Sequence, residues 1–392
     1  MIDRWMLLLL AVLLTACHGS DEDDSSSEDC YLDIHVYAPD RPIVTRGDVG
    51  EVPPSDAEKT VHSLQIWAFK NKDGARVGYL DVDPASEAYA DPTYLNQLGQ
   101  QTYRMKVSRD FADHPEAVDV YVVANAESCG FTEDHKFNAY TKRSDLDDAK
   151  IGKAYFGTTP PLVSTAEDIR SKGGLPMSAV EKNQPIYGAF PSLRIGKENE
   201  MTTLKLTRAV SKLRFVLCRK DDSNSTKKLK QINSISLNGN QIPDNTWLIA
   251  REVSNYSQRT HDAINYGPVN VIPIVYDPLI YAYETQTAQE YEDLINDAVS
   301  KGDLQQLGLT YLRESDLQLK GNINYTYTDD NTDKTVDTEF SMAAPGDFLR
   351  NHSWIIYVYY MDTKIHVQVV TDIGMRPWSP DEKDESVIVY NW

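Results

Sequence analysis

The chain of 392 residues has few basic side chains and very few cysteines. Lys and Arg number 39 against 59 Asp and Glu, which gives a formal net charge of −20 at pH 7. Nucleic acids and anionic membrane surfaces are bound through clustered Lys and Arg, so this balance disfavours both as partners. The four cysteines show no metal-ligand spacing and are too few for a disulfide framework, although a single disulfide is possible; they are Cys17, Cys30, Cys129 and Cys218.

Motifs of catalysis and of cofactor binding are also lacking. Lys172-Gly173-Gly174 follows a predicted helix, so it predicts a helix stop and not a phosphate-binding loop. Asp329 to Asp333 lacks the glycine and distal Glu of a calcium loop and favours a polar hairpin turn. No nucleophile or acid–base pair stands out. Six scattered histidines form no metal pair: His62, His114, His135, His261, His352 and His366. We therefore predict a protein that is no enzyme and binds no cofactor or metal.

Only one hydrophobic run is long, and it lies at the start of the chain. Arg4 precedes an apolar run from Trp5 to Leu14, and Thr15-Ala16-Cys17 follows with two small residues and a cysteine. The run is about half of the roughly 20 residues that a spanning helix needs. We therefore predict that residues 1–16 are a secretory signal peptide and that Cys17 becomes the acylated, palmitate-bearing first residue of a lipoprotein. A hydrophobic start with an incidental cysteine is the alternative.

The segment after Cys17 is acidic and contains no apolar side chain from Asp21 to Asp29. Such a segment cannot compensate for the entropy of ordering, so it predicts a tether. The acidic run resembles the surface-export signals of Bacteroidetes lipoproteins, which favours the outer membrane and the cell surface as the location of the precursor.

Most of the remaining chain shows the two-residue alternation of β-strands. Leu32, Ile34 and Val36 alternate with polar residues, and Val118 to Ala124 is apolar enough for a strand that is covered on both faces. Similar strands are predicted at 61–69, 204–209, 213–218, 232–237, 355–361 and 366–370. Two helices are predicted as insertions, one from Thr287 to Gly302 and one from Ser164 to Gly174. The pattern favours β-sandwiches over alternating strands and helices.

The domain organisation follows from where this pattern changes. Residues 17–46 would contain the tether and the first strand, and residues 47–200 an N-terminal β-sandwich with a loop-rich stretch after residue 140. Regular alternation after 201 predicts a second β-sandwich over 201–376. Pro377 and Pro380 separate a last segment, 377–392, which could supply an extra strand.

Several short stretches, taken in order, resemble the Bacteroidetes fimbrillins, the type V pilins. Val61 to Phe69 resembles the strand that opens their N-terminal domain, and Val120 to Asn125 and Leu175 to Ser178 resemble a later strand and loop. Leu206 to Lys212 is similar to the entry of their C-terminal domain, and Arg350 to Trp354 to its late strand. With the lipoprotein signal in front, the resemblance covers most of the chain.

This resemblance implies two transthyretin-like, Greek-key β-sandwich domains and a mechanism of assembly. In the family an arginine-specific protease removes the first strand together with the lipid, and a strand of a neighbouring subunit fills the exposed groove. The matching cut here lies between Arg46 and Gly47, with Arg41 as a second candidate that Pro42 disfavours. The implied donor strand is Val387-Ile388-Val389-Tyr390, and the implied partners are other pilin subunits, accessory pilins and the protease.

Other roles stay open at the level of sequence. Arg46 could be an ordinary exposed linker residue, and Arg46-Gly47-Asp48 spells a tripeptide that some adhesion receptors bind. The chain could be a stalk, tip, accessory or anchor pilin, with a host or bacterial surface ligand that the sequence does not identify. A lipoprotein that binds surface glycans through its Tyr and Trp residues and never polymerises is the alternative from another class.

Overall fold

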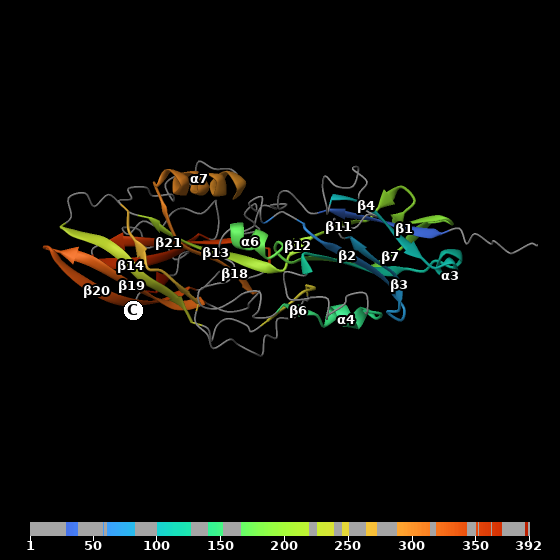
Figure 1. Cartoon of the computed structure of the whole chain (residues 1–392), viewed down its shortest axis with the longest axis horizontal. Coiled ribbons are helices and arrows are strands. Elements are labelled where there is room, and N and C mark those ends of the chain that lie inside the picture. The colour runs from blue at the N-terminus through green and yellow to red at the C-terminus, as the bar shows by residue number, and fades with distance from the viewer. Residues whose placement is uncertain are drawn as a thin grey trace, which may run out of the picture.

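The computed structural model shows an elongated, mainly β molecule with two groups of sheets placed end to end (Figure 1). It describes residues 29–37, 58, 61–82, 100–126, 140–151, 166–218, 226–238, 245–250, 264–272, 288–313, 319–342, 350–351, 353–361, 363–370 and 389–390. Mainly β architecture with few helices is the fold class that the alternating sequence predicted, so that prediction is confirmed.

The first half is a sandwich of two sheets. One sheet contains β1 (Cys30–Tyr37), β4 (Gln100–Val107), β8 (Ile186–Ala189), β9 (Ser192–Lys197), β10 (Glu200–Met201) and β11 (Thr203–Lys205). The other contains β2 (Leu64–Lys70), β3 (Arg76–Val82), β5 (Val118–Ala124), β7 (Met177–Gln184) and β12 (Thr207–Arg208). Leu32 and Ile34 of the first sheet share one core with Ile66 and Val122 of the second.

The second half is also built from two sheets. One contains β13 (Val210–Cys218), β18 (Gln305–Arg313), β21 (Ser353–Met361) and β22 (Lys364–Val370). The other contains β14 (Lys227–Leu237), β16 (Ile264–Tyr266), β17 (Val269–Asn270), β19 (Leu319–Asp329), β20 (Thr332–Met342) and β23 (Val389–Tyr390). Phe215 and Ile356 of one sheet pack with Tyr325 and Phe340 of the other in a single core.

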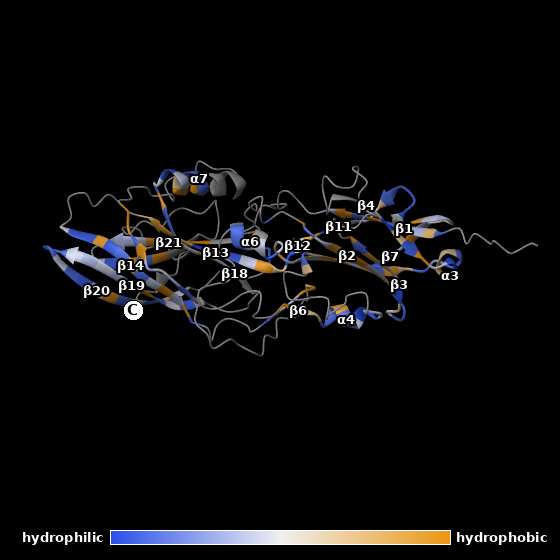
Figure 2. Cartoon of the chain, viewed as in Figure 1, coloured by the Kyte–Doolittle hydropathy of each residue, from blue (hydrophilic) through white to orange (hydrophobic). Residues whose placement is uncertain are grey.

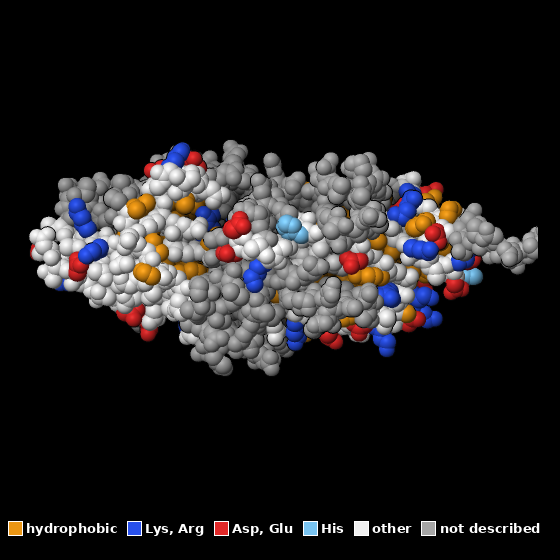
Figure 3. Space-filling model, viewed as in Figure 1, with side chains coloured by type: hydrophobic (Ala, Val, Ile, Leu, Met, Phe, Trp, Pro, Cys, Tyr) orange, Lys and Arg blue, Asp and Glu red, His pale blue; other side chains and the backbone are white. Residues whose placement is uncertain are grey.

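Burial explains why the strongest sequence signals formed strands. In β1 every second residue is buried, and in β5 all seven residues are buried because both faces of the strand are covered. Figure 2 shows hydrophobic residues along the strands of both halves, whereas β20 is largely hydrophilic. In Figure 3 the charged side chains of the visible face of the first half are of both signs and interspersed. Exposed ion pairs such as Lys106–Asp29 belong to this surface and contribute little to stability because solvent screens them.

Two predictions about strands were wrong. The stretch from 140 to 200 was expected to be loop-rich, yet β7 to β10 fill most of residues 177–201. These strands are polar and partly exposed, so they lack a clear apolar alternation. The single strand predicted over 204–209 is instead divided between β11 and β12, which belong to opposite sheets. Both pair with strands of the first half, and the predicted boundary at residue 200 stays a prediction.

The two predicted helices are confirmed. The 14-residue helix α7 (Ala288–Lys301) packs Ile295 and Ala298 against Val216 and Tyr357 on the outer face of the β13–β21 sheet. Helix α6 is Ala166–Ser171. Short helices in the described residues also include α3 (Arg109–Asp113) and α4 (Arg143–Asp147). Within the described ranges no helix is long and apolar enough to cross a bilayer.

The predicted helix stop after α6 is confirmed at Gly173 and Gly174. Both glycines have positive φ angles, +78° and +95°. The N–H of Gly174 donates to the carbonyl of Ile169 at 2.9 Å, which ends the helix. A Cβ on Gly174 would lie 2.3 Å from the Asn125 side-chain nitrogen, whereas one on Gly173 would meet nothing within 4 Å.

We expect Gly174→Ala to destabilise the protein far more than Gly173→Ala. Each substitution costs about 1–2 kcal/mol for a left-handed backbone, and the collision with Asn125 adds about 1–3 kcal/mol at Gly174 only. Urea unfolding of both variants measures the difference. Equal unfolding free energies for the two variants would contradict the packing described here.

Candidate functional site

Strand β1 lies inside its sheet, with hydrogen-bonded strands on both edges. Along one edge it pairs antiparallel with β4 over its full length, from Cys30↔Val107 to Tyr37↔Gln100. Along the other edge Tyr31 to Asp33 run parallel to β9, and His35 to Tyr37 run parallel to β11. Without β1 the sheet would therefore keep a slot lined by two rows of unpaired backbone groups.

Burial of one face holds β1 in this slot. Cys30, Leu32, Ile34 and Val36 are at most 2% exposed, and full burial of an aliphatic side chain stabilises by about 1.5–3 kcal/mol. On the outer face the Arg104 guanidinium donates to the Asp33 carboxylate at 2.9 and 3.2 Å. Because Arg104 is 57% exposed, this ion pair contributes at most about 1 kcal/mol. The apolar alternation of β1 is thus its main attachment.

Most residues that the sequence predicted for lipidation, cleavage and strand donation lie outside the described part of the chain. These are Cys17, Arg46, Gly47, Val387 and Ile388. Val389 and Tyr390 form β23, which pairs antiparallel with the end of β20 through Tyr390↔Ser341 and Val389↔Met342. The described part of the predicted donor segment, Val389 and Tyr390, thus pairs with the edge of the second half of its own chain.

A charged cluster around the buried Glu58 joins the two halves, and we call it the joint: Glu58, Arg208, Lys212, Tyr311 and Asn351. The Lys212 ammonium lies 2.9 Å from Glu58 Oε1, and the Tyr311 hydroxyl donates to the same oxygen. Arg208 donates from Nε to the Glu58 carbonyl at 3.0 Å and from Nη1 to Asn351 Oδ1 at 2.9 Å. The joint therefore fixes the residue that precedes β2 to strands of the second half.

The environment of Glu58 keeps its carboxyl ionised. Glu58 is only 2% exposed, and this burial by itself raises the pKa of its carboxyl. The positive charge of Lys212 and the hydrogen bonds from Tyr311 and Lys212 outweigh burial, and they lower the pKa to about 2 from its ordinary value of 4.5. Because the Glu58 carboxylate is buried and bound by several partners, the loss of any one of them would destabilise the joint.

Apolar packing and backbone pairing continue the contact around the joint. Trp67 and Tyr121 of the first half share a core with Val210, Leu248 and Tyr311. The short strands β6 (Lys150–Ile151) and β15 (Thr246–Trp247) pair across the halves. Arg350 donates to the carbonyls of Leu248 and Trp247 at 3.2 and 2.9 Å. The two sandwiches are therefore held together by a shared core as well as by charge.

Comparison with solved structures shows which known proteins share this architecture. The tip fimbrial protein Mfa3 from Porphyromonas gingivalis matches with a TM-score of 0.50 over 87% of this chain and 98% of its own, at 14% sequence identity. A candidate cell adhesion protein from Parabacteroides distasonis matches with a TM-score of 0.53 over 93% and 97%, at 10% identity. The chain has the fold of the Bacteroidetes fimbrial proteins. No protein-family model and no curated protein matches the sequence itself.

In this fimbrial fold the stretches that carried the sequence resemblance meet one another. Arg208, from Leu206 to Lys212, binds Asn351, from Arg350 to Trp354, although 143 positions separate them. Asn125, at the end of Val120 to Asn125, donates to the carbonyl of Leu175 at 2.8 Å. These residues close the joint and the first sandwich, so their role is structural. Glu58 and Tyr311 were not predicted from the sequence as members of this cluster, because an isolated Glu or Tyr carries no periodic signal.

Other chemistry predicted to be absent was searched for in the described residues. No group of three or more His, Cys, Asp or Glu side chains there could hold a metal. Cys30 and Cys218 are buried thiols in different cores, and Cys129 lies outside the described ranges. The polar hairpin turn predicted at Asp329 to Asp333 is confirmed, with Asp330 and Asn331 at positive φ and Lys334 paired with Asp329 at 2.6 Å.

We expect Glu58→Gln to lower the free energy of unfolding at pH 7 by about 3–5 kcal/mol, because it leaves the largely buried Lys212 ammonium without its counter-charge. Asp333→Asn is the matched control: it breaks the Lys230–Asp333 pair, whose side chains are 58% and 47% exposed, and should hardly change the stability because solvent screens the pair. Urea unfolding compares the two, and similar losses would contradict a special role for the joint.

The joint also predicts a dependence of stability on acid. The folded pKa of Glu58, about 2, lies below its ordinary value of 4.5, so the unfolded chain takes up the proton first. The contribution of this group is therefore complete above pH 4.5 and is lost as the pH falls towards 2, to a total of about 3 kcal/mol. Urea unfolding between pH 6 and 2 should show this loss in the natural chain, with a correspondingly smaller loss in Glu58→Gln.

Proposed function

We propose that this chain is a subunit of a cell-surface fimbria that is exported as a lipoprotein, loses its leader by a cut after Arg46, and polymerises by strand exchange. The observation that carries the proposal is the placement of β1, which occupies a slot bounded by β4 on one edge and by β9 and β11 on the other. The fimbrial fold supports the same class of function.

Strand exchange follows physically from the loss of such a strand. Removing β1 exposes two rows of backbone N–H and C=O groups, together with the core that Leu32, Ile34 and Val36 had covered. An extended segment from a second molecule restores the backbone hydrogen bonds, and alternating apolar side chains refill the core. A subunit without β1 therefore gains stability by accepting a strand from a neighbour.

The positions of β1 and of the joint limit where the leader can be cut. The cut has to follow Tyr37, where β1 ends, and to precede Glu58, which the joint holds to the second half. The arginines of residues 38–57 are Arg41 and Arg46, and Pro42 follows Arg41. Arg46 is thus the better site for an arginine-specific protease. A lipid on Cys17 would leave with the leader.

The C-terminal segment is the proposed donor strand. Val387 and Val389 alternate with Ile388 and Tyr390, so the segment can place apolar side chains on the core face of a slot. Among the described residues β23 is paired at two positions with its own chain, whereas β1 pairs with β4 over eight. Such a short pairing can be given up for a longer one. Tip, accessory and anchor roles and a non-polymerising glycan-binding lipoprotein remain the alternatives.

Treatment of the purified precursor with an arginine-specific protease should give a chain that begins at Gly47. We expect Arg46→Ala to keep its leader and to stay monomeric, because β1 then remains covalently attached. Arg41→Ala, the matched control, should be cut like the natural chain. Mass spectrometry of the N-terminus and size-exclusion chromatography measure both results. A mature surface protein that retains acylated Cys17 would instead support an anchor or a glycan-binding lipoprotein.

Removal of residues 378–392 should leave the cut chain monomeric, since no donor strand is then available for the slot of a neighbour. Removal of Asn391 and Trp392 alone is the control, because Val387 to Tyr390 remain and oligomers should form. Light scattering of the cut chains gives the molecular mass. Oligomers that form unchanged without residues 378–392 would rule out this segment as the donor.

A further inference from the structure

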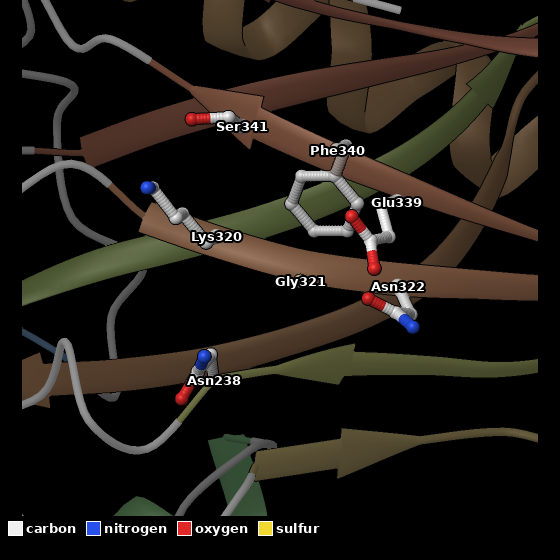
Figure 4. Close-up of a pocket in the computed structure, with 7 residues that line it drawn as sticks. All are labelled: Asn238, Lys320, Gly321, Asn322, Glu339, Phe340 and Ser341. Atoms are coloured by element: carbon white, nitrogen blue, oxygen red, sulfur yellow. The ribbon is translucent and has the colours of Figure 1, made fainter. Parts of the chain in front are cut away.

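The second half contains a pocket of about 580 Å³ on the sheet formed by β14, β19 and β20 (Figure 4). Its polar lining consists of Asn238, Lys320, Asn322, Glu339 and Ser341. The volume lies in the range of about 300–1,000 Å³ that is typical of small-molecule sites. Neither the joint nor the slot around β1 includes any of these residues.

Strand register brings the polar residues together. Lys320 lies opposite Ser341 and Asn322 lies opposite Glu339 on the paired strands β19 and β20. Asn238, directly after β14, donates its backbone N–H to the carbonyl of Lys320 at 2.8 Å. Figure 4 shows these side chains around the hollow, with Glu339 pointing toward Asn322. Three neighbouring strands thus contribute to one polar site.

Gly321 and Phe340 face each other between the two polar pairs and complete the lining. A Cβ on Gly321 would lie 2.1 Å from the Ser236 carbonyl oxygen and 2.7 Å from Phe340 Cζ, so glycine is required there. Phe340 is only 5% exposed and packs into the core below. The floor of the pocket between the polar side chains is thus backbone, and the Phe340 ring lies on the core side of the sheet.

Four of the five polar side chains of the lining have no partner within the described part of the chain. No hydrogen bond or ion pair there engages the side chain of Lys320, Asn322, Glu339 or Ser341, and Lys320 and Glu339 do not pair despite their opposite charges. At the turn end of the same hairpin the polar groups are satisfied by one another. Lys334 pairs with Asp329, Thr328 donates to Asp333 at 3.1 Å, and Thr326 bonds Thr335 at 3.1 Å.

We propose that this pocket binds a neutral sugar unit of a surface glycan. One ammonium and one carboxylate cancel in charge, which disfavours an ion as the ligand. Two amides, a hydroxyl, an ammonium and a carboxylate supply both donors and acceptors on one face. Adjacent sugar hydroxyls donate and accept at once, so they match this mixture. The site would give the proposed surface protein an adhesive function in addition to strand exchange.

Saturation-transfer NMR on the purified full chain tests the proposal. The probes are the methyl glycosides of glucose, galactose, mannose and N-acetylglucosamine, with glucuronic acid as an anionic comparison. We expect saturation transfer from at least one neutral glycoside. The double variant Asn322→Ala/Glu339→Ala should weaken that binding about tenfold or more, because each lost hydrogen bond contributes on the order of 1 kcal/mol and the bond to a carboxylate contributes more.

The matched control is Asp337→Ala, an exposed residue of the same strand two positions from Glu339 and outside the pocket lining. It should bind the sugar like the natural chain. The absence of transfer from every neutral glycoside, transfer from glucuronic acid alone, or unchanged binding by the double variant would each overturn the proposal. Neither Asn322 nor Glu339 lies near the slot or the joint, so the double variant should still be cut at Arg46 and should still polymerise. Loss of sugar binding with normal polymerisation therefore distinguishes this proposal from the fimbrial one.

Discussion

The two-sided pairing of β1 is the constraint on which the rest of this structure depends. A strand at the edge of a sheet can leave and expose only one row of backbone groups. β1 is bounded by β4 on one side and by β9 and β11 on the other, and it covers the core with every second side chain. Its loss opens a slot that water cannot fill favourably, so a first half without β1 has a strong physical reason to bind another strand.

Strand replacement is compatible with a stable subunit only if the remainder of the chain stays in place. The joint meets this requirement, since Glu58 is held by Lys212 and Tyr311 of the second half and by Arg208 of β12, while the proposed leader lies before it in sequence. The shared core of Trp67, Tyr121 and Leu248 adds apolar contact between the halves. A rod made of such subunits would transmit force through this packed contact as well as through the exchanged strand.

The second half combines two kinds of polar surface on one hairpin. At the turn between β19 and β20 lysine and aspartate side chains pair with one another, which protects an edge strand from unwanted association. At the open end of the hairpin the polar side chains surround the hollow over Gly321. The same sheet thus carries a protected edge and a candidate binding surface, and the C-terminal strand β23 pairs beside the latter.

The sequence alone determined the features that depend on local periodicity and turn chemistry. These are the β-rich class, the alternation of β1, the burial of β5 on both faces, both helices and the hairpin turn at Asp330, together with the resemblance to fimbrial proteins. It failed for the polar strands from β7 to β10, where periodicity is weak, and for the division of residues 204–209 between two sheets. Only the tertiary structure decided that β1 is enclosed on both edges, that Glu58 meets Tyr311 across 253 positions, and that Asn322 and Glu339 flank one pocket. Such contacts depend on strand register and on the packing of distant segments, and neither leaves a periodic pattern in the chain.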